Sequence, residues 1–133
     1  DQGEIKGDLH DFYVTFMTSI FRSVRFGASS AHGKANMIRF NYFSNAGAFS
    51  RNEKDGTYRV NVKEFEQAIK NLSRDILVMQ GQGDYQKVSD FVAQQGNISE
   101  QLQADLARLA AASIPVDIVY KQGTAVLGLD SLN

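Results

Sequence analysis

The chain has 133 residues, and a hydrophobic content of 43% is enough for the core of one domain. Its 14 Lys and Arg nearly balance its 15 Asp and Glu, which argues against a nucleic-acid binder that works by neutralising phosphates. No apolar stretch approaches the roughly 18 residues of a membrane span, and a chain without cysteine has no disulfide framework, thiolate nucleophile or cysteine-based zinc site. We therefore expect a single domain over residues 1–133, with neither a nucleic acid nor a membrane as partner.

The first helix is expected to begin after Asp8, a suitable N-cap, and to end before Gly27. Its apolar residues recur at helical spacing in two neighbouring stripes, Leu9, Phe12, Phe16 and Ile20 in one and Tyr13, Met17 and Val24 in the other. Two stripes give a wide apolar face, so this helix should be largely buried.

A second helix is expected from a cap at Ser29 or Ser30 to about Ala46, with Gly47 after it. Its apolar stripe is expected to comprise Ala31, Ala35, Ile38 and Tyr42. The following stretch alternates around an Asp55-Gly56 pair, which predicts a β-hairpin whose charged run at 51–55 is a solvated loop.

Three more helices complete the expected fold. Asn61 and Glu64 are spaced as in a capping box and open a helix that should end before Gly81. Asp84 caps the next helix, which should run to about Gln95 and be buried through its apolar residues Val88, Phe91 and Val92. Ser99 caps the last, with Leu102, Leu106 and Leu109 on one stripe. The prediction is a mainly α domain of about five helices with one hairpin, and with loose ends at 1–7 and 123–133.

Few residues in the chain can carry catalytic chemistry. His10 and His32 are its two histidines, whereas a catalytic zinc site normally needs three or four His, Cys or carboxylate ligands. The sequence has neither a Gly-x-Ser-x-Gly elbow nor a phosphate-binding loop, because the Gly33-Lys34 pair has no preceding glycine at the required spacing. We therefore predict no metal site within this chain.

One edge of the second helix carries the best candidate site. His32, Asn36 and Arg39 are spaced i, i+4 and i+7, which places them on one helical face. His32 would lie among the free backbone N–H groups of the first turn, which suits a neutral hydrogen-bond donor. Such an edge could bind a carbonyl or a developing oxyanion, and Gly33 would allow another backbone or a ligand to approach closely.

The residues alone leave an ordinary structural explanation open. In it, His32 is a surface residue of the first turn, Arg39 pairs with a carboxylate and Gly33 is merely tolerated. His10, beside Asp8 and Asp11, would be a solvated residue. Arg22 and Arg25 would interact with the C-terminal end of the first helix dipole.

A resemblance to a known family bears on this choice. The stretch "FRSVRFGASSAHGKANMIRFNYFSNAGAF" resembles the C-terminal part of the dipeptidyl peptidase III family of zinc metallopeptidases, and especially the peptidase-like proteins fused to a Nudix hydrolase domain. Further matches are "LSRDILVMQGQGDY" and "IPVDI", so the resemblance covers about residues 12–118.

The resemblance implies a two-lobed enzyme whose helical lobe holds zinc through an HExxxH-type helix and a later glutamate, all upstream of a segment like this one. Zinc is thus expected in the parent protein, none in this chain, and the compartment would be cytoplasmic. The family's cleft-facing histidine, which stabilises the transition state, corresponds to His32. Where family members carry an arginine near the substrate, this sequence has Asn36. Asn36, Arg39 and Asn41 are the candidates for substrate binding.

Two functions follow. The chain is expected to be the C-terminal part of a zinc-dependent peptidase, inactive alone, that meets its peptide substrate together with the upstream part of the polypeptide. The alternative is a non-catalytic helical module that supports or regulates an attached Nudix-type hydrolase, or binds a peptide or protein partner. In either case the apolar faces of the first two helices should be exposed in the isolated chain and favour self-association.

Overall fold

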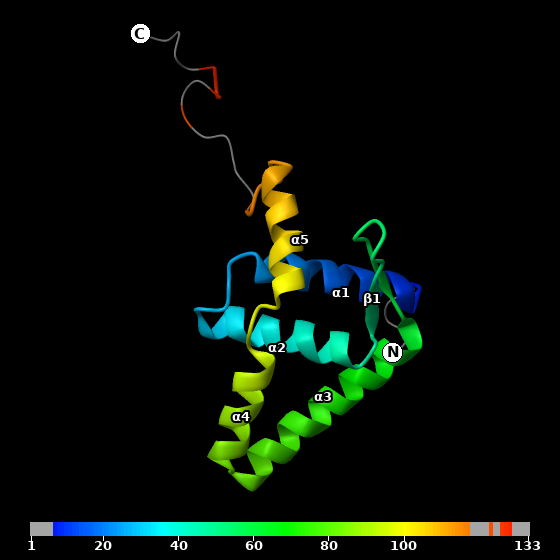
Figure 1. Cartoon of the computed structure of the whole chain (residues 1–133), viewed down its shortest axis with the longest axis vertical. Coiled ribbons are helices and arrows are strands. Elements are labelled where there is room, and N and C mark those ends of the chain that lie inside the picture. The colour runs from blue at the N-terminus through cyan, green and yellow to red at the C-terminus, as the bar shows by residue number, and fades with distance from the viewer. Residues whose placement is uncertain (1–6, 118–122, 124–125, 129–133) are drawn as a thin grey trace.

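The computed structural model describes residues 7–117, 123 and 126–128. This part of the chain forms five helices and one two-stranded antiparallel sheet, shown in Figure 1: α1 (Leu9–Val24), α2 (Ala31–Asn45), β1 (Phe49–Arg51), β2 (Tyr58–Val60), α3 (Val62–Gln82), α4 (Tyr85–Gln95) and α5 (Glu100–Ala111). The predicted mainly α class with one hairpin is confirmed. Among the described residues, no helix has the length and apolar character needed to cross a bilayer.

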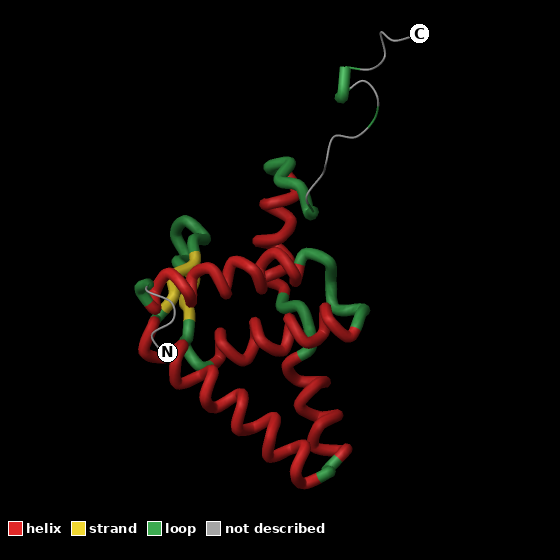
Figure 2. The backbone as a smooth tube through the Cα atoms, turned by 180° about the vertical axis from the view of Figure 1, so that it is seen from behind, coloured by secondary structure: helices red, strands yellow, loops and turns green. Residues whose placement is uncertain are grey.

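Helix α2 is the central element of the fold. It runs antiparallel to α1 and also contacts α3, α4 and β1. Helices α2, α3 and α4 form the three sides of a triangle, and α5 extends away from that triangle beyond α1 (Figures 1 and 2). The strands pair in register, with Phe49 opposite Val60 and Arg51 opposite Tyr58.

The core is built from aromatic side chains that α1, α2, α3 and the hairpin contribute. Phe65 of α3 stacks on Tyr13 with ring centroids 4.8 Å apart, and it also contacts Phe43 at 4.9 Å. On α2 the buried residues are Gly33, Met37, Phe40 and Phe43, so the predicted stripe of Ala31, Ala35, Ile38 and Tyr42 is wrong. The observed face buries larger side chains, and burial free energy grows with the apolar area removed from water.

Helix α1 is less buried than its two apolar stripes predicted. Met17, Ile20 and Val24 lie in the core, because α2 and the hairpin cover that side of the helix. The rest of the stripe that contains Ile20 is open to solvent: more than a third of the side-chain surface is accessible at Leu9, Phe12 and Phe16, and the same holds for the neighbouring Val14.

Most of the predicted helix ends are confirmed; the end of α3 is corrected, and so is the capping bond expected at its start, where Asn61 is the N-cap as predicted. Side chains of the predicted caps accept backbone N–H bonds at the starts of α1, α2, α4 and α5. Asn61 makes no such bond with its side chain; instead its own N–H donates to the Ala48 carbonyl at 2.8 Å. Helix α3 continues through Gly81 and ends at Gly83, whose φ of 64° is the left-handed conformation that terminates helices.

Two further expectations concern α4 and the chain ends. The apolar residues Val88, Phe91 and Val92 of α4 are half-buried rather than buried, because α4 packs mainly against α2. The predicted loose ends at 1–7 and 123–133 lie largely outside the described residues.

Candidate functional site

The N-terminus of α2 is shaped by the loop that precedes it. The Ser30 hydroxyl oxygen accepts a hydrogen bond from the Gly33 N–H at 3.0 Å and caps the helix. Gly27 has a φ of 83°, and its carbonyl oxygen lies directly against the Cα of Gly33, where any Cβ would collide with it. The predicted close approach at Gly33 therefore exists, and the approaching group is backbone of the α1–α2 loop.

His32 projects from this first turn into solvent. Its side chain is exposed, and within the described part of the chain the imidazole has no hydrogen-bond partner. An exposed position fits the structural explanation of His32 as a surface residue of the first turn, and the catalytic role expected for it stays a prediction. Both ring nitrogens are available to a ligand or to another part of a longer polypeptide.

Asn36 and Arg39 lie along the same edge of α2 and interact with each other. The Arg39 Nη1 donates to the Asn36 Oδ1 at 3.1 Å, so the amide carbonyl orients the guanidinium. Asn36 is half-buried and Arg39 is exposed. The helix is continuous from Ala31 to Asn45, so His32, Asn36 and Arg39 share one face, as their spacing predicts.

Asn41 lies on the opposite side of α2, nine residues and about half a turn from His32. Its Nδ2 donates to the carbonyl oxygens of Gln95 and Asn97, both at 2.7 Å. This amide therefore fastens the C-terminal end of α4 to α2. The structure does not bring it together with His32, Asn36 and Arg39.

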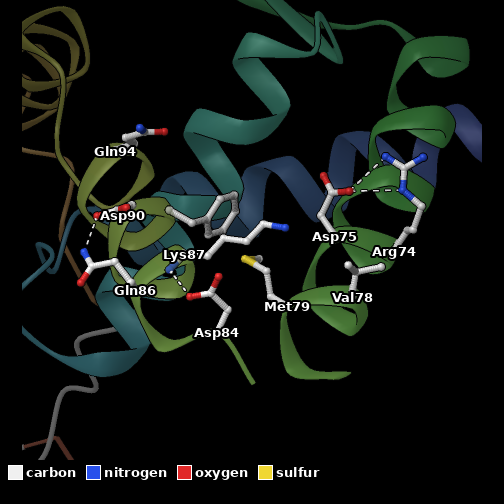
Figure 3. A pocket seen from close by; sticks show the side chains of 10 residues that line it. Arg74, Asp75, Val78, Met79, Asp84, Gln86, Lys87, Asp90 and Gln94 are labelled. Atoms are coloured by element: carbon white, nitrogen blue, oxygen red, sulfur yellow. Dashed lines mark hydrogen bonds and ion pairs between the residues drawn. The ribbon is translucent and has the colours of Figure 1, made fainter. Parts of the chain in front are cut away.

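Two of the hollows in the described structure involve α3 and α4, and one of them also reaches α2. Arg39 stands at the rim of an apolar one of about 280 Å³ between α2, α3 and α4. The other, of about 610 Å³, lies between α3 and α4 and is lined by several charged residues, with Lys87 directing its amine toward the Asp75 side (Figure 3); it is called the polar hollow below. Met79 and Phe91 line both hollows and so separate them.

A hydrogen bond between α2 and α3 lies beside the polar hollow. The Tyr42 hydroxyl donates to the Asp75 Oδ2 at 2.7 Å, and Arg74 pairs with the same carboxylate at 3.0 Å. Burial and the bond to Asp75 raise the pKa of Tyr42 to about 12, and the same bond together with Arg74 lowers the pKa of Asp75. The sequence analysis missed this pair, since Tyr42 was assigned to an apolar stripe.

The strongest polar cluster joins the hairpin to α5. The guanidinium of Arg51 donates two hydrogen bonds to the Asp105 carboxylate, from Nε to Oδ2 at 2.8 Å and from Nη2 to Oδ1 at 2.9 Å. The Tyr58 hydroxyl donates to the same carboxylate at 2.6 Å. Only 7% of Asp105 is exposed, and the Arg51 bonds hold the pKa of this carboxyl well below its usual range despite burial.

This junction was also missed from the sequence, because the charged run at 51–55 was assigned to a solvated loop. A signal was present: Asp105 falls on the buried side of the Leu102, Leu106 and Leu109 stripe, where a carboxylate needs a partner. Burial and the bond to Asp105 raise the pKa of Tyr58, and the bond to Asp105 raises the pKa of Arg51.

The two arginines at the end of α1 hold the segment that follows α5. Arg22 pairs with Asp117 at 2.7 Å, and Arg25 donates to the carbonyl oxygens of Pro115 at 2.7 Å and Ile114 at 2.5 Å. His10 is exposed, with its Nδ1 3.6 Å from the Asp11 carboxylate. Over the described ranges, no three His, Asp or Glu side chains come together in a way that could hold a metal ion.

Comparisons with known proteins show which sequences the chain is similar to. The chain is 37% identical over 113 residues to "Nudix hydrolase 3" of Arabidopsis thaliana, a match that covers 85% of this chain and 14% of the plant protein. A comparison with protein-family models found no match.

Two solved structures have a similar fold. A DPP III from Caldithrix abyssi superposes on 80% of the chain with a TM-score of 0.73 and 35% identity. A dipeptidyl-peptidase III from Corallococcus sp. strain EGB superposes on 90% with a TM-score of 0.74 and 33% identity. The chain spans only 20% and 22% of these proteins, and 14% of the plant relative. The chain is therefore similar in sequence and in fold to one helical region of DPP III proteins. It is also similar in sequence to part of a protein named as a Nudix hydrolase.

Proposed function

We propose that the chain is the C-terminal helical part of a dipeptidyl-peptidase III-like hydrolase and that His32 binds the substrate's developing oxyanion. The observation that carries the proposal is the superposition on two dipeptidyl-peptidase III structures over 80% and 90% of the chain, at identities of 35% and 33%. The position of His32 supports its assigned role, because its imidazole is exposed and has no partner in the part of the chain that the structure describes, so it is open to a ligand.

The zinc of such an enzyme would be bound outside the described residues. These residues contain no cluster of three His, Asp or Glu, so they do not fit a zinc site, and no step through the metal is assigned to them. Zinc bound elsewhere in a peptidase would polarise the scissile carbonyl and activate water. The contribution proposed for this chain is hydrogen bonding from one edge of α2.

His32 would act through a hydrogen bond that strengthens as the carbonyl oxygen becomes negative. A donor of this kind, when preorganised, typically contributes about 10²- to 10³-fold in rate. Arg39, oriented by Asn36, would bind the substrate about 10 Å further along the same edge, seven residues from His32. Asn41 was a third candidate for substrate binding, but its bonds to the end of α4 make it a structural residue in this proposal.

The test is a dipeptidyl-release assay on the full-length protein that contains this chain, with and without a zinc chelator. His32→Ala should lower kcat about 10²-fold or more, with a smaller effect on KM, and the chelator should abolish release. His10→Ala is the matched control, because His10 is also exposed but lies at the other end of the α1–α2 pair. Equal rates for His32→Ala and the parent, at equal stability, would remove His32 from the reaction.

A second candidate is a non-catalytic module attached to a Nudix-type hydrolase. The match to a protein named "Nudix hydrolase 3" over 85% of this chain favours it. In that case the full-length protein would release no dipeptides. Deleting this region would instead lower the thermal stability or the activity of the attached hydrolase. These two measurements distinguish the candidates.

Both candidates assign a role to the open side of α1. Leu9, Phe12 and Phe16 present an apolar stripe that polypeptide outside this chain would cover in a longer protein. In the isolated chain the same stripe would favour self-association. Sedimentation velocity over a hundredfold concentration range should show reversible oligomers that Phe12→Ser weakens. A strict monomer throughout would contradict this part of the proposal.

A further inference from the structure

The residues that line the apolar hollow between α2, α3 and α4 range from buried to exposed. Its floor is formed by Leu72 and Met79, which are buried. Ile76 of α3 also lines the hollow and is exposed. The walls are formed by half-buried apolar residues of α2 and α4: Ile38, Val88, Phe91 and Val92. All three helices contribute lining residues, and these helices form the triangle seen in Figures 1 and 2. At about 280 Å³ it has room for one large apolar side chain.

Two polar groups stand at the rim of this hollow, Arg39 and Gln80. The guanidinium of Arg39 donates to the neutral Asn36 carbonyl and, over the described residues, to no carboxylate. Arg22, Arg51 and Arg74 differ from it, since each pairs with an aspartate. The apolar hollow is thus bordered by a positive charge that the described residues leave unneutralised.

We infer that the hollow binds the apolar C-terminal residue of a peptide, with the terminal carboxylate paired to Arg39. The planar guanidinium can hold a carboxylate through two parallel N–H bonds, and Asn36 orients it from the other side. Gln80 offers an amide to the peptide bond before that residue, a group that a simple alkyl carboxylate lacks. The inference rests on the proposed function for its ligand class, a peptide, and adds a subsite along the edge of α2 from His32.

The test measures binding by the 133-residue chain itself and needs neither zinc nor turnover. The probes are acetyl-Leu-Phe with a free carboxylate and the same peptide as its C-terminal amide, titrated by calorimetry and by methyl NMR. The free acid should bind at least tenfold more tightly than the amide. The methyl signals that shift should be those of the lining, Ile38, Ile76, Val88 and Val92.

Two pairs of variants separate the charge from the hollow. Arg39→Gln should abolish the tenfold preference for the acid, whereas Arg74→Gln, which removes an arginine already paired with Asp75, should retain it. Ala35→Leu places a larger side chain on the exposed α2 side of the hollow and should weaken both probes, whereas Ala93→Leu, on an exposed α4 position outside it, should not. Ala35 and Ala93 are not core residues, so both variants should fold, which far-UV circular dichroism checks.

Three results would overturn the inference. Equal affinity for acid and amide would remove the role of Arg39. Shifts confined to the polar hollow around Asp75 and Lys87 would place the ligand elsewhere. Decanoate that binds more tightly than the peptide and displaces it would assign the hollow to a lipid carboxylate. Dipeptide release by the full-length protein tests the proposed function separately, so either proposal can fail while the other stands.

Discussion

The hairpin–α5 junction and the His32 edge of α2 are both rich in polar side chains, but they use them differently. At the junction, Asp105 is buried and accepts bonds from Arg51 and Tyr58. Along the edge, His32 is exposed and, among the described residues, has no hydrogen-bond partner, and the partner of Arg39 there is the neutral Asn36. Polar groups that a fold needs for stability are bonded within it, and those left open are where a ligand can bind.

The junction should therefore account for a large share of stability. Asp105→Ala leaves the Arg51 guanidinium and the Tyr58 hydroxyl without their shared acceptor, and we expect a loss of about 3 kcal/mol in the free energy of unfolding. Urea denaturation measures it. The control is Glu53→Ala, which removes the exposed partner of the same arginine and should have little effect. A loss no larger than that of the control would show that the junction is not a stabilising element.

The contribution of the junction to stability should depend on pH. The folded-state pKa of Asp105 is depressed below the ordinary value of 3.8, so its contribution is present above that pH and lost as pH falls through the folded pKa. The stability difference between the wild type and Asp105→Ala should thus be constant from about pH 5 upward and shrink below about pH 4. Urea midpoints at several pH values measure it, and a difference independent of pH would contradict the charge-based explanation.

Two glycines in helices differ in the space around them: Gly33 lies against the backbone of another segment, and Gly81 has open space around it. Gly33→Ala forces a Cβ onto the Gly27 carbonyl, and we expect a loss of about 2 kcal/mol although alanine favours a helix. Gly81→Ala, inside α3 with open space around it, should instead gain about 0.5–1 kcal/mol. Thermal unfolding of both variants measures the effects. Stabilisation by both would mean that the α1–α2 loop does not rest on Gly33.

Asn41 tests whether a polar residue of α2 is structural or functional. Asn41→Ala leaves the carbonyl oxygens of Gln95 and Asn97 without this donor, and we expect a loss of about 1 kcal/mol. In the full-length protein, KM for a peptide substrate should stay within about twofold of the parent, because Asn41 is not a substrate contact in this proposal. Loss of a direct contact worth about 1.4 kcal/mol of binding would instead raise KM about tenfold. Unchanged stability together with a raised KM would return Asn41 to the substrate site.

His32→Ala should have the smallest effect on stability. An exposed side chain without an internal partner contributes little, and the change in unfolding free energy should stay within about 0.5 kcal/mol. Urea denaturation of the 133-residue chain is sufficient, with His10→Ala alongside it. A loss above 1 kcal/mol would identify His32 as a structural residue and weaken the contrast between edge and junction.

The predictions from sequence succeeded where local rules decide the outcome. Helix caps at Asp8, Ser30, Asp84 and Ser99 follow from one side chain and the next backbone N–H, and all four are observed. The rules failed where a choice depended on distant neighbours. Gly81 does not end α3: the helix continues past it to Gly83, whose left-handed backbone terminates the helix.

The candidate site divides in the same way. Helical periodicity alone places His32, Asn36 and Arg39 on one edge, since that relation lies within one element. Which side of α2 faces the core depended on how α1, α3 and the hairpin pack against it, and periodicity misplaced that side by choosing the smaller alanine stripe. The pairing of Asp105 with Arg51, 54 residues apart, was likewise decided only by the fold.

The sequence by itself thus determined the element types, most of their ends and the polar edge of α2, because these depend on spacing and on groups within about one helical turn. The tertiary structure alone decided which polar groups are bonded inside the protein and which remain open, because a partner from another element must first be brought within hydrogen-bond distance. That difference is what separates the closed junction at Asp105 from the open edge at His32.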